Sequence, residues 1–249
     1  MNRLVIFWGM RGGVPARERA GMTMIKFYFH PTPNPLKVAL FLEEAGLEHE
    51  LVPVDTMKGE QHEPGFRAVN PNGKLPAIED DGERVFDSNA ILLYLADKYG
   101  KFEGKPEDRG ALLSWLMFIA SGLGPFSGQS VHFRHMAPEK PAYAVNRYWR
   151  EAGRHYQVMN DHLEGRTYFV GDDYTIVDIA AWGWVGRAGR VLGDDALDAY
   201  PNVARWFALV DARPAAARAK ETGKGIAFKT ERDEVALRAM FPQNYPAEA

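Results

Sequence analysis

The chain has 249 residues, 46% of them hydrophobic, and carries 30 basic against 33 acidic side chains. A net charge of −3 without a long run of like charges gives no indication that the partner is a nucleic acid or an anionic membrane surface. The sequence contains no cysteine, which excludes disulfides, zinc–thiolate sites and a cysteine nucleophile. We expect a globular protein with a small-molecule partner, and no segment of the roughly 18 apolar residues that a membrane span needs.

The first 23 residues are rich in Arg and Gly and include the short apolar stretch "LVIFWGM". A basic start before an apolar stretch suggests a signal peptide, but no small-residue cleavage pattern follows this one. We therefore expect residues 1–23 to be a disordered extension outside the fold.

Residues 24–104 alternate between strand and helix patterns. The segments in chain order are a strand at 24–30, a helix at 35–46, a strand at 48–55, a Gly- and Pro-bearing stretch, strands at 75–81 and 83–88, and a helix at 89–100. Both helical segments stop at glycine, Gly46 and Gly100, which suits a left-handed C-cap. A βαβ unit followed by a hairpin and a helix predicts a small α/β domain of thioredoxin-like type.

Helical periodicity dominates residues 105–222, which predicts a second, all-helical domain. Within it, Thr175 and Asp178 have the spacing of a capping box and are assigned a structural role. The stretch "GLGP" at 122–125 lacks the strand context of a nucleotide-binding loop, so we expect it to end a helix. Residues 223–249 lose periodicity and are expected to form a tail on the surface.

The junction between the first strand and the first helix reads "HPTPNP", with Thr32 and Asn34 between three prolines. Proline fixes φ, so the turn is stiff, and Pro35 suits the first turn of the helix. A hydroxyl and an amide at this point could cap the helix or bind an anion at its positive end. The junction alone favours capping.

The order of these elements, with "NGKLPAIEDDG" and "VFDSNAILLYLADKYG" between the two domains, resembles the soluble glutathione transferases from Met24 to about Lys220. The resemblance implies a cis peptide bond before Pro76, so that the Leu75 backbone pairs with the cysteinyl part of glutathione. It also implies that Ser88 receives the γ-glutamyl carboxylate at a helix N-terminus and that Asp87 binds the α-ammonium group.

The "TPN" turn resembles the nu class of this family and the related yeast prion-like nitrogen regulator. The resemblance implies that Thr32 and Asn34 lie beside the glutathione sulfur and act as the catalytic residues. It adds three residues to the expected glutathione site, namely Gln61, Lys74 and Arg147. An acceptor pocket is expected in the helical domain, with Phe126, His132 and Phe133 in its wall.

A free thiol has a pKa of roughly 8.5, so a site that donates hydrogen bonds to the thiolate favours the reactive form. Tyr28 competes for this role, because a tyrosine activates the thiol in several classes of the family, but its place within a strand favours core packing. His132 and His135 have a spacing that some metal sites use, but no acidic partner follows at ligand distance. We therefore expect no metal.

The resemblance implies a glutathione-dependent disulfide-bond oxidoreductase that uses one or two glutathione molecules, or oxidised glutathione, and no covalently bound cofactor. Glutathione transfer to carbon electrophiles (conjugation, dehalogenation or aryl-ether cleavage) is the alternative enzyme reaction. A non-catalytic, glutathione-binding regulatory protein is the alternative of another class. The family also leads us to expect a homodimer in the cytoplasm, with neither nucleic acid nor membrane as partner.

Overall fold

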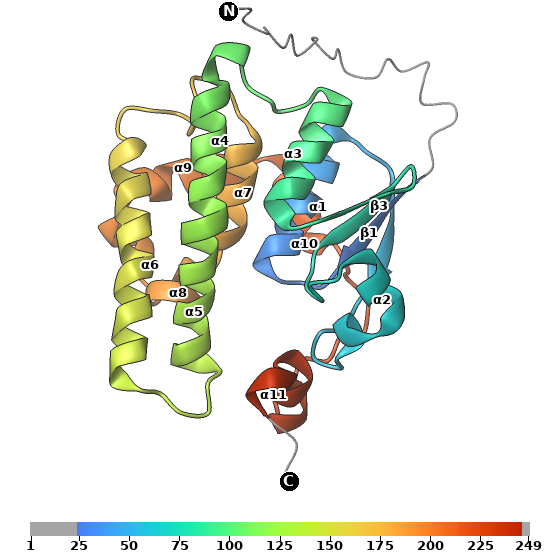
Figure 1. Cartoon of the computed structure of the whole chain (residues 1–249). Coiled ribbons are helices and arrows are strands. Elements are labelled where there is room, and N and C mark those ends of the chain that lie inside the picture. The colour runs from blue at the N-terminus through green and yellow to red at the C-terminus, as the bar shows by residue number, and fades with distance from the viewer. Residues whose placement is uncertain (1–23, 246–249) are drawn as a thin grey trace, which may run out of the picture.

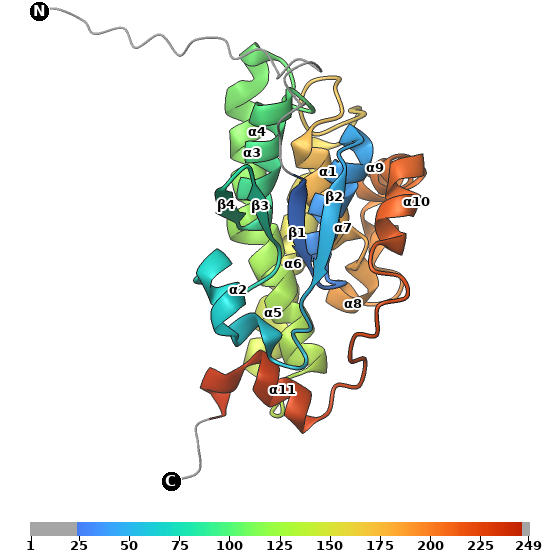
Figure 2. The same cartoon turned by 90° about the vertical axis from the view of Figure 1, so that its right-hand side faces the viewer.

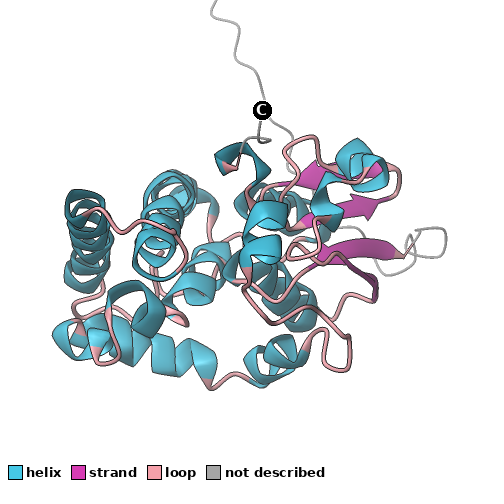
Figure 3. Cartoon of the chain, turned by 90° about the horizontal axis from the view of Figure 1, so that it is seen from below, coloured by secondary structure: helices cyan, strands magenta, loops and turns pink. Residues whose placement is uncertain are grey.

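The computed structural model describes residues 24–245, and the predicted extension at 1–23 lies outside the described residues. A mixed four-stranded sheet with its helices occupies one side of the molecule, and the helical domain occupies the other (Figures 1 and 3). The architecture is that of a glutathione transferase fold, with a thioredoxin-like domain followed by an all-helical domain, as predicted.

The strands are β1 (Ile25–Phe29), β2 (His49–Pro53), β3 (Ala77–Asp80) and β4 (Glu83–Phe86). The helices of the first domain are α1 (Pro33–Ala45), α2 (Pro64–Val69) and α3 (Ser88–Tyr99). The helices that follow are α4 (Arg109–Phe118), α5 (Gly124–His135), α6 (Ala142–His162), α7 (Ile176–Val185), α8 (Ala188–Leu192), α9 (Pro201–Asp211), α10 (Pro214–Glu221) and α11 (Glu234–Met240).

The sheet has the strand order β2-β1-β3-β4, with β1 parallel to β2 and antiparallel to β3 (Figure 2). The pair Phe27 and Phe29 in β1 is fully buried, because alternate residues of a strand face the same side. Between β2 and β3, the short helix α2 and a 3₁₀ turn at Glu60–His62 occupy the stretch for which no element was predicted. Their shortness leaves too little periodicity to detect.

The two predicted helices of the sheet domain, α1 and α3, end as predicted. Gly46 follows α1 with φ +64°, and Gly100 follows α3 with φ +63°. Each backbone N–H closes the helix on a carbonyl of its last turn, that of Leu42 for Gly46 and that of Ala96 for Gly100. Only glycine adopts this left-handed conformation without a Cβ penalty.

The prediction that "GLGP" ends a helix is wrong. A π-helical turn over Ile119–Leu123 connects α4 directly to α5, and Pro125 falls in the first turn of α5, where its missing N–H does no harm. The glycines serve close packing instead. A Cβ on Gly122 would come within 2.3 Å of His155, and one on Gly124 would come within 3.1 Å of the Trp184 indole nitrogen.

The same helical run, Pro106–His135, is long and apolar enough by length and composition to cross a membrane, which the sequence analysis did not anticipate. Its side chains Leu112, Leu116, Ile119 and Leu123 are nevertheless fully buried within the protein. The run therefore serves as a core helix of this fold, and composition alone is weak evidence for a span.

The two domains share one core. Helix α7 packs against α1 so closely that a Cβ on Gly183 would lie 2.6 Å from the Pro33 carbonyl oxygen. At the base of α7 the predicted capping box is confirmed: Thr175 accepts a hydrogen bond from Val177, and Asp178 accepts one from the Thr175 N–H at 3.0 Å. The close approach of Gly183 to Pro33 places the start of α1 against the helical domain.

Residues 224–245 form more than the surface tail that the sequence predicted. They cross back toward the sheet domain and form α11, which lies below α2 and the end of α5 (Figures 1 and 2). The Lys229 N–H donates to Asp55 at 2.7 Å, and the Ala239 carbonyl accepts from Gln61 at 3.0 Å. Seven helical residues give no long periodic pattern, which is why this helix was missed.

Candidate functional site

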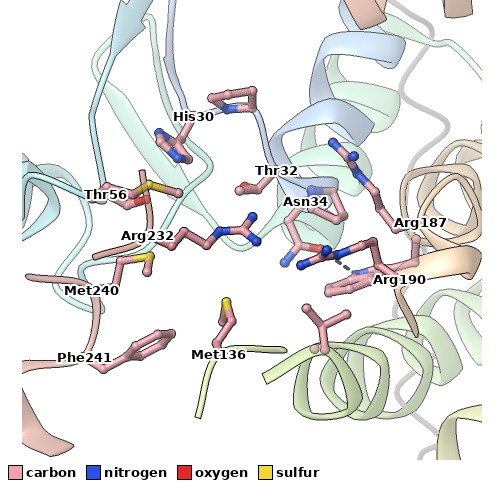
Figure 4. A pocket seen from close by; sticks show the side chains of 16 residues that line it. His30, Thr32, Asn34, Thr56, Met136, Arg187, Arg190, Arg232, Met240 and Phe241 are labelled. Carbon is pink, nitrogen blue, oxygen red and sulfur yellow. Dashed lines mark hydrogen bonds between the residues drawn. The ribbon is translucent and has the colours of Figure 1, made fainter. Parts of the chain in front are cut away.

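A cavity of about 540 Å³ opens beside the N-terminus of α1. Five parts of the chain contribute to its wall: the turn before α1, the loop after β2, helix α5, the α7–α8 junction and the C-terminal segment. The lining residues used below are His30, Thr32, Asn34, Gly128, Val131, Met136, Trp184, Arg187, Arg190, Arg232, Met240 and Phe241 (Figure 4). The turn with Thr32 and Asn34 thus forms part of the cavity wall.

Thr32 occupies the N-cap position of α1 but makes no capping hydrogen bond with its side chain. Its backbone is extended, with φ −125° and ψ 164°, and its N–H donates to the His30 carbonyl at 2.7 Å. The prolines at 33 and 35 have no N–H to cap. The capping role that the junction alone favoured is therefore not realised, and the hydroxyl is exposed at the cavity.

Asn34 is held from the other side of the cavity. The Trp184 indole N–H donates to Asn34 Oδ1 at 3.0 Å. Because an indole nitrogen can only donate, this bond assigns the amide oxygen to Trp184 and leaves the Asn34 NH₂ group free to donate elsewhere. The glycines Gly124 and Gly128 give the indole the space for this position. The arrangement offers one oriented amide donor beside one hydroxyl.

The segment that precedes β3 has the predicted backbone. The Leu75–Pro76 peptide bond is cis. The turn before it is held by Asn70, whose side chain donates to the Lys74 carbonyl at 2.6 Å and accepts from the Asn72 N–H at 2.9 Å. The Lys74 side chain is exposed on this turn.

Asp87 and Ser88 lie at the start of α3. Asp87 adopts φ +70°, and its carboxylate accepts from the N–H groups of Asn89 and Ala90 at 2.9 and 3.2 Å, so in this structure it caps the helix. The Ser88 hydroxyl accepts a hydrogen bond from Lys37 Nζ at 3.3 Å. Lys37 comes from α1, the helix that Thr32 begins. Ser88 therefore contacts α1, the helix that follows the Thr32–Asn34 turn.

The buried lysine is unusual, because charged side chains are rarely fully buried without an ionic partner. Lys37 is 1% exposed, and burial lowers its pKa to about 7, while the charge of Asp87 opposes the shift. Near neutral pH a part of the Lys37 population is thus an uncharged amine behind Ser88.

Gln61, predicted to bind glutathione, is buried and bonds through its amide nitrogen to the Ala239 carbonyl of α11 at 3.0 Å. Its amide oxygen is buried without a hydrogen-bond partner. Gly73 lies next to it, since a Cβ there would be 3.2 Å from the Gln61 carbonyl oxygen. Gln61 therefore joins the turn before Pro76 to the C-terminal segment.

Arg147 does not reach this cavity within the chain. It lies on α6, is about half exposed, and pairs with Glu151 of the next helical turn at 3.8 Å. Arg147 would contribute to the site only in an arrangement other than that of this single chain, one that brings its guanidinium group to the cavity.

The structure also corrects the predicted acceptor wall. Phe126 stacks on His155, and Phe133 stacks on Tyr148, so both rings face α6. Gly128, Val131 and Met136 line the cavity instead. A helix buries one face only, and which face of α5 lines the cavity depends on its packing against the neighbouring helices.

His132 lies close to the cavity through Phe241, with ring centroids 5.1 Å apart, and burial lowers its pKa. His135 is engaged elsewhere, because its Nε2 lies 2.9 Å from the Arg190 carbonyl oxygen. In residues 24–245 no group of three or more metal-ligating side chains gathers.

Tyr28 is unsuited to activate a thiol. Its hydroxyl donates to Glu79 at 3.1 Å, and its ring packs against Phe66. Burial, reinforced by the Glu79 charge, raises the pKa of Tyr28 to about 12. The side chain is part of the core packing, as its strand position predicted.

Sequence reasoning missed three arginines of the cavity, Arg187, Arg190 and Arg232. The first two follow the aromatic stripe "AAWGWV", and the third lies in the segment that was expected to be a surface tail. Their spacing along the chain carries no signal that they meet.

Comparison with known proteins agrees with this architecture. The family model for the glutathione S-transferase N-terminal domain matches residues 22–97, and the C-terminal domain model matches residues 142–209. The disulfide-bond oxidoreductase YfcG of Escherichia coli K12 is 45% identical over 204 residues, which cover 79% of this chain and 94% of YfcG.

Two solved structures extend the likeness. A glutathione transferase of Burkholderia graminis, with two glutathione molecules bound per subunit, superposes with a TM-score of 0.75 at 37% identity, over 81% of this chain and 89% of that one. The transferase URE2P8 of Phanerochaete chrysosporium, with oxidised glutathione, gives 0.76 at 34% identity, over 80% and 94%. The chain therefore belongs to the glutathione transferase family, among relatives of the nu and Ure2-like kind.

Proposed function

We propose that the protein is a glutathione-dependent disulfide-bond oxidoreductase in which Thr32 and Asn34 stabilise a glutathione thiolate. The observation that carries this proposal is the pair of donors at the cavity: a threonine hydroxyl that caps nothing and an asparagine amide whose oxygen is occupied by Trp184. Hydrogen bonds donated to the thiolate lower the pKa of the thiol. Neither residue is a base, so the site acts by stabilising the anion.

The reaction needs two glutathione molecules, because the chain supplies no sulfur nucleophile of its own. The first thiolate attacks one sulfur of the substrate disulfide, forming a mixed disulfide and releasing one substrate thiol after protonation. The second glutathione, as thiolate, attacks the mixed disulfide and releases the other substrate thiol together with oxidised glutathione. Two glutathiones thus lose two electrons to one substrate disulfide.

The remaining contacts would hold the peptide of the first glutathione. The Leu75 backbone before Pro76 would pair with its cysteinyl part, and Ser88 would receive its γ-glutamyl carboxylate. Asp87 would bind its ammonium group while it keeps its capping bonds. Gln61 and the exposed Lys74 complete the proposed site within one chain. Arg147, which does not reach the cavity in this chain alone, would join the site through the homodimer proposed below.

Arg147 and Lys74 bring positive charge for the carboxylates of glutathione.

We extend the proposal to a homodimer, in which the sheet domain of one subunit meets the helical domain of the other. We also propose that the protein works in the cytoplasm, where reduced glutathione is available to drive the exchange.

The experiment is a comparison of glutathione-dependent turnover of 2-hydroxyethyl disulfide with conjugation of a chloro-nitroaromatic substrate. We expect disulfide turnover to dominate and Thr32→Val to lower it by about 100-fold, the usual loss for one donor to a reacting anion. Thr32→Ser keeps the hydroxyl and is expected to retain most of the activity. Dominant conjugation would move the reaction to carbon electrophiles. Glutathione binding without either reaction would favour a regulatory protein.

A further inference from the structure

The cavity described above carries an excess of positive charge. Arg190 belongs to α8, Arg187 precedes it, and Arg232 lies just before α11. Arg190 and Arg232 reach toward each other from opposite sides, near Thr32 and Asn34, and Arg187 lies beyond Arg190 (Figure 4). We call these three residues the arginine cluster.

No carboxylate balances this charge among the described side chains that line the cavity. The structure shows no ion pair to any of the three arginines within residues 24–245. Other arginines of the chain are paired, for example Arg213 with Glu44 and Arg218 with Glu43. Burial, followed by the neighbouring charges of Arg190 and Arg187, lowers the pKa of Arg232. Like charges gathered without a counterion are unfavourable until an anion binds between them.

Hydrogen bonds fasten the backbone on both sides of the cluster to the fold, and the three arginine side chains themselves are exposed at the cavity. On one side, the carbonyl of Val191 accepts from Ser130 at 2.7 Å and from Arg134 at 2.7 Å, which ties α8 to α5. On the other, Asp233 caps α11 by accepting from the Ala236 N–H at 2.8 Å.

Anchors before and after Arg232 hold its backbone in place. The Lys229 N–H bonds to Asp55, and Gln61 bonds to the Ala239 carbonyl. The C-terminal segment therefore brings Arg232 to the cavity as a built part of the site.

We propose that the arginine cluster is a carboxylate-binding site on the acceptor side of the cavity, which gives the enzyme a preference for anionic reactants. Guanidinium groups match carboxylates with two parallel hydrogen bonds, which a point charge does not. The inference rests on the proposed disulfide exchange. The carboxylate has two possible sources, the acceptor disulfide itself and the second glutathione, and both must approach the same sulfur.

The first arm of the test varies the charge of the acceptor. Three small symmetric disulfides serve as substrates with glutathione: dithiodiglycolate, which is dianionic, 2-hydroxyethyl disulfide, which is neutral, and cystamine, which is dicationic. If the acceptor supplies the carboxylate, kcat/KM falls in that order. Arg190→Gln and Arg232→Gln then each lower kcat/KM for dithiodiglycolate by about tenfold, the loss of one charged hydrogen bond, and change the neutral substrate less than about twofold.

The second arm keeps the neutral acceptor and varies glutathione. If the second glutathione supplies the carboxylate, the two variants raise the apparent KM for glutathione by about tenfold and leave the order of the three acceptors unchanged. Arg238→Gln is the matched control, because it removes an arginine of α11 that pairs with Glu234 and does not line the cavity. It is expected to change neither arm.

The third measurement does not depend on turnover. Oxidised glutathione, which carries four carboxylates, is titrated against the intrinsic tryptophan fluorescence of the protein, to which Trp184 contributes from the cavity wall. Arg190→Gln and Arg232→Gln are expected to weaken its binding by about tenfold each. A wild-type protein that reduces none of the disulfides would overturn the proposed reaction, while this titration still tests the cluster. Unchanged acceptor preference, glutathione KM and binding of oxidised glutathione in both variants would overturn the carboxylate site.

Discussion

Trp184 donates a 3.0 Å hydrogen bond to Asn34 although the two residues are 150 positions apart. The bond connects the strand-to-helix turn of the sheet domain with α7 of the helical domain. The bond orients the Asn34 amide, so its NH₂ donor is in place before any ligand binds. Donors that are preorganised in this way contribute strongly to stabilising a reacting anion. Gly124 and Gly128 of α5 leave space for the Trp184 indole, which donates this hydrogen bond. The proposed catalysis therefore depends on the packing between the domains.

Trp184→Phe keeps the ring in place and removes its donor. We expect glutathione-dependent disulfide turnover to fall by about tenfold, because one hydrogen bond worth about 1.4 kcal/mol no longer orients Asn34. Steady-state kcat/KM measures the effect. Trp182→Phe is the control, since Trp182 donates a bond of equal length to Asp211 and none to Asn34. Equal losses in the two variants would show that the effect is general to α7 and independent of Asn34.

The buried Lys37 predicts a pH dependence of stability. Its pKa is lowered to about 7 in the folded protein, whereas the unfolded chain keeps the ordinary value of 10.5. Between these two values the unfolded state binds one proton more, so the free energy of unfolding rises with pH from about 7 upward, by at most about 1.4 kcal/mol per unit.

Urea unfolding at pH 7, 8 and 9 tests this dependence by comparing the wild type with Lys37→Met. The wild type should gain stability relative to the variant as the pH rises. Lys58→Met removes an exposed lysine that pairs with Asp55 and serves as the control. A constant difference between wild type and Lys37→Met across this range would mean that Lys37 stays charged in the folded protein.

Asp178 predicts a large loss of stability. Its fully buried carboxylate accepts from the Phe169 N–H, the Thr175 N–H and the Trp206 indole at 3.2, 3.0 and 2.8 Å. Asp178→Ala leaves three buried donors unpaired and should lower the free energy of unfolding by about 3 kcal/mol. Chemical denaturation gives the number. Asp173→Ala, which breaks an exposed pair with Lys105, should cost less than about 0.5 kcal/mol.

The sheet domain was predictable because its signals are local. Alternation in β1 and the glycine C-caps of α1 and α3 each act within a few residues, as does the Thr175–Asp178 spacing in the helical domain. The cis bond at Pro76 was expected from the family resemblance and is present. Prolines mark the turn that contains Thr32 and Asn34, and the expectation that these two residues contact the glutathione sulfur comes from the family resemblance.

The rest of the site depends on contacts between distant segments. The side of α5 that faces the cavity is decided by the packing of α6, which turns Phe126 and Phe133 away from it. The seven-residue helix α11 is too short to show a period, so the approach of Arg232 to Arg190 had no local signal. Such long-range convergence requires the fold.

The pKa of the thiol of bound glutathione is the measurement that tests the central claim most directly. The thiolate is followed by its ultraviolet absorbance during a pH titration, with S-methylglutathione as the reference, and the chain adds no cysteine signal of its own. We expect the thiol pKa to fall by about 2 units from its free value of roughly 8.5, and Thr32→Val to restore at least about 1 unit of that shift while Thr32→Ser does not. A bound thiol that titrates like free glutathione in the wild type would contradict the account.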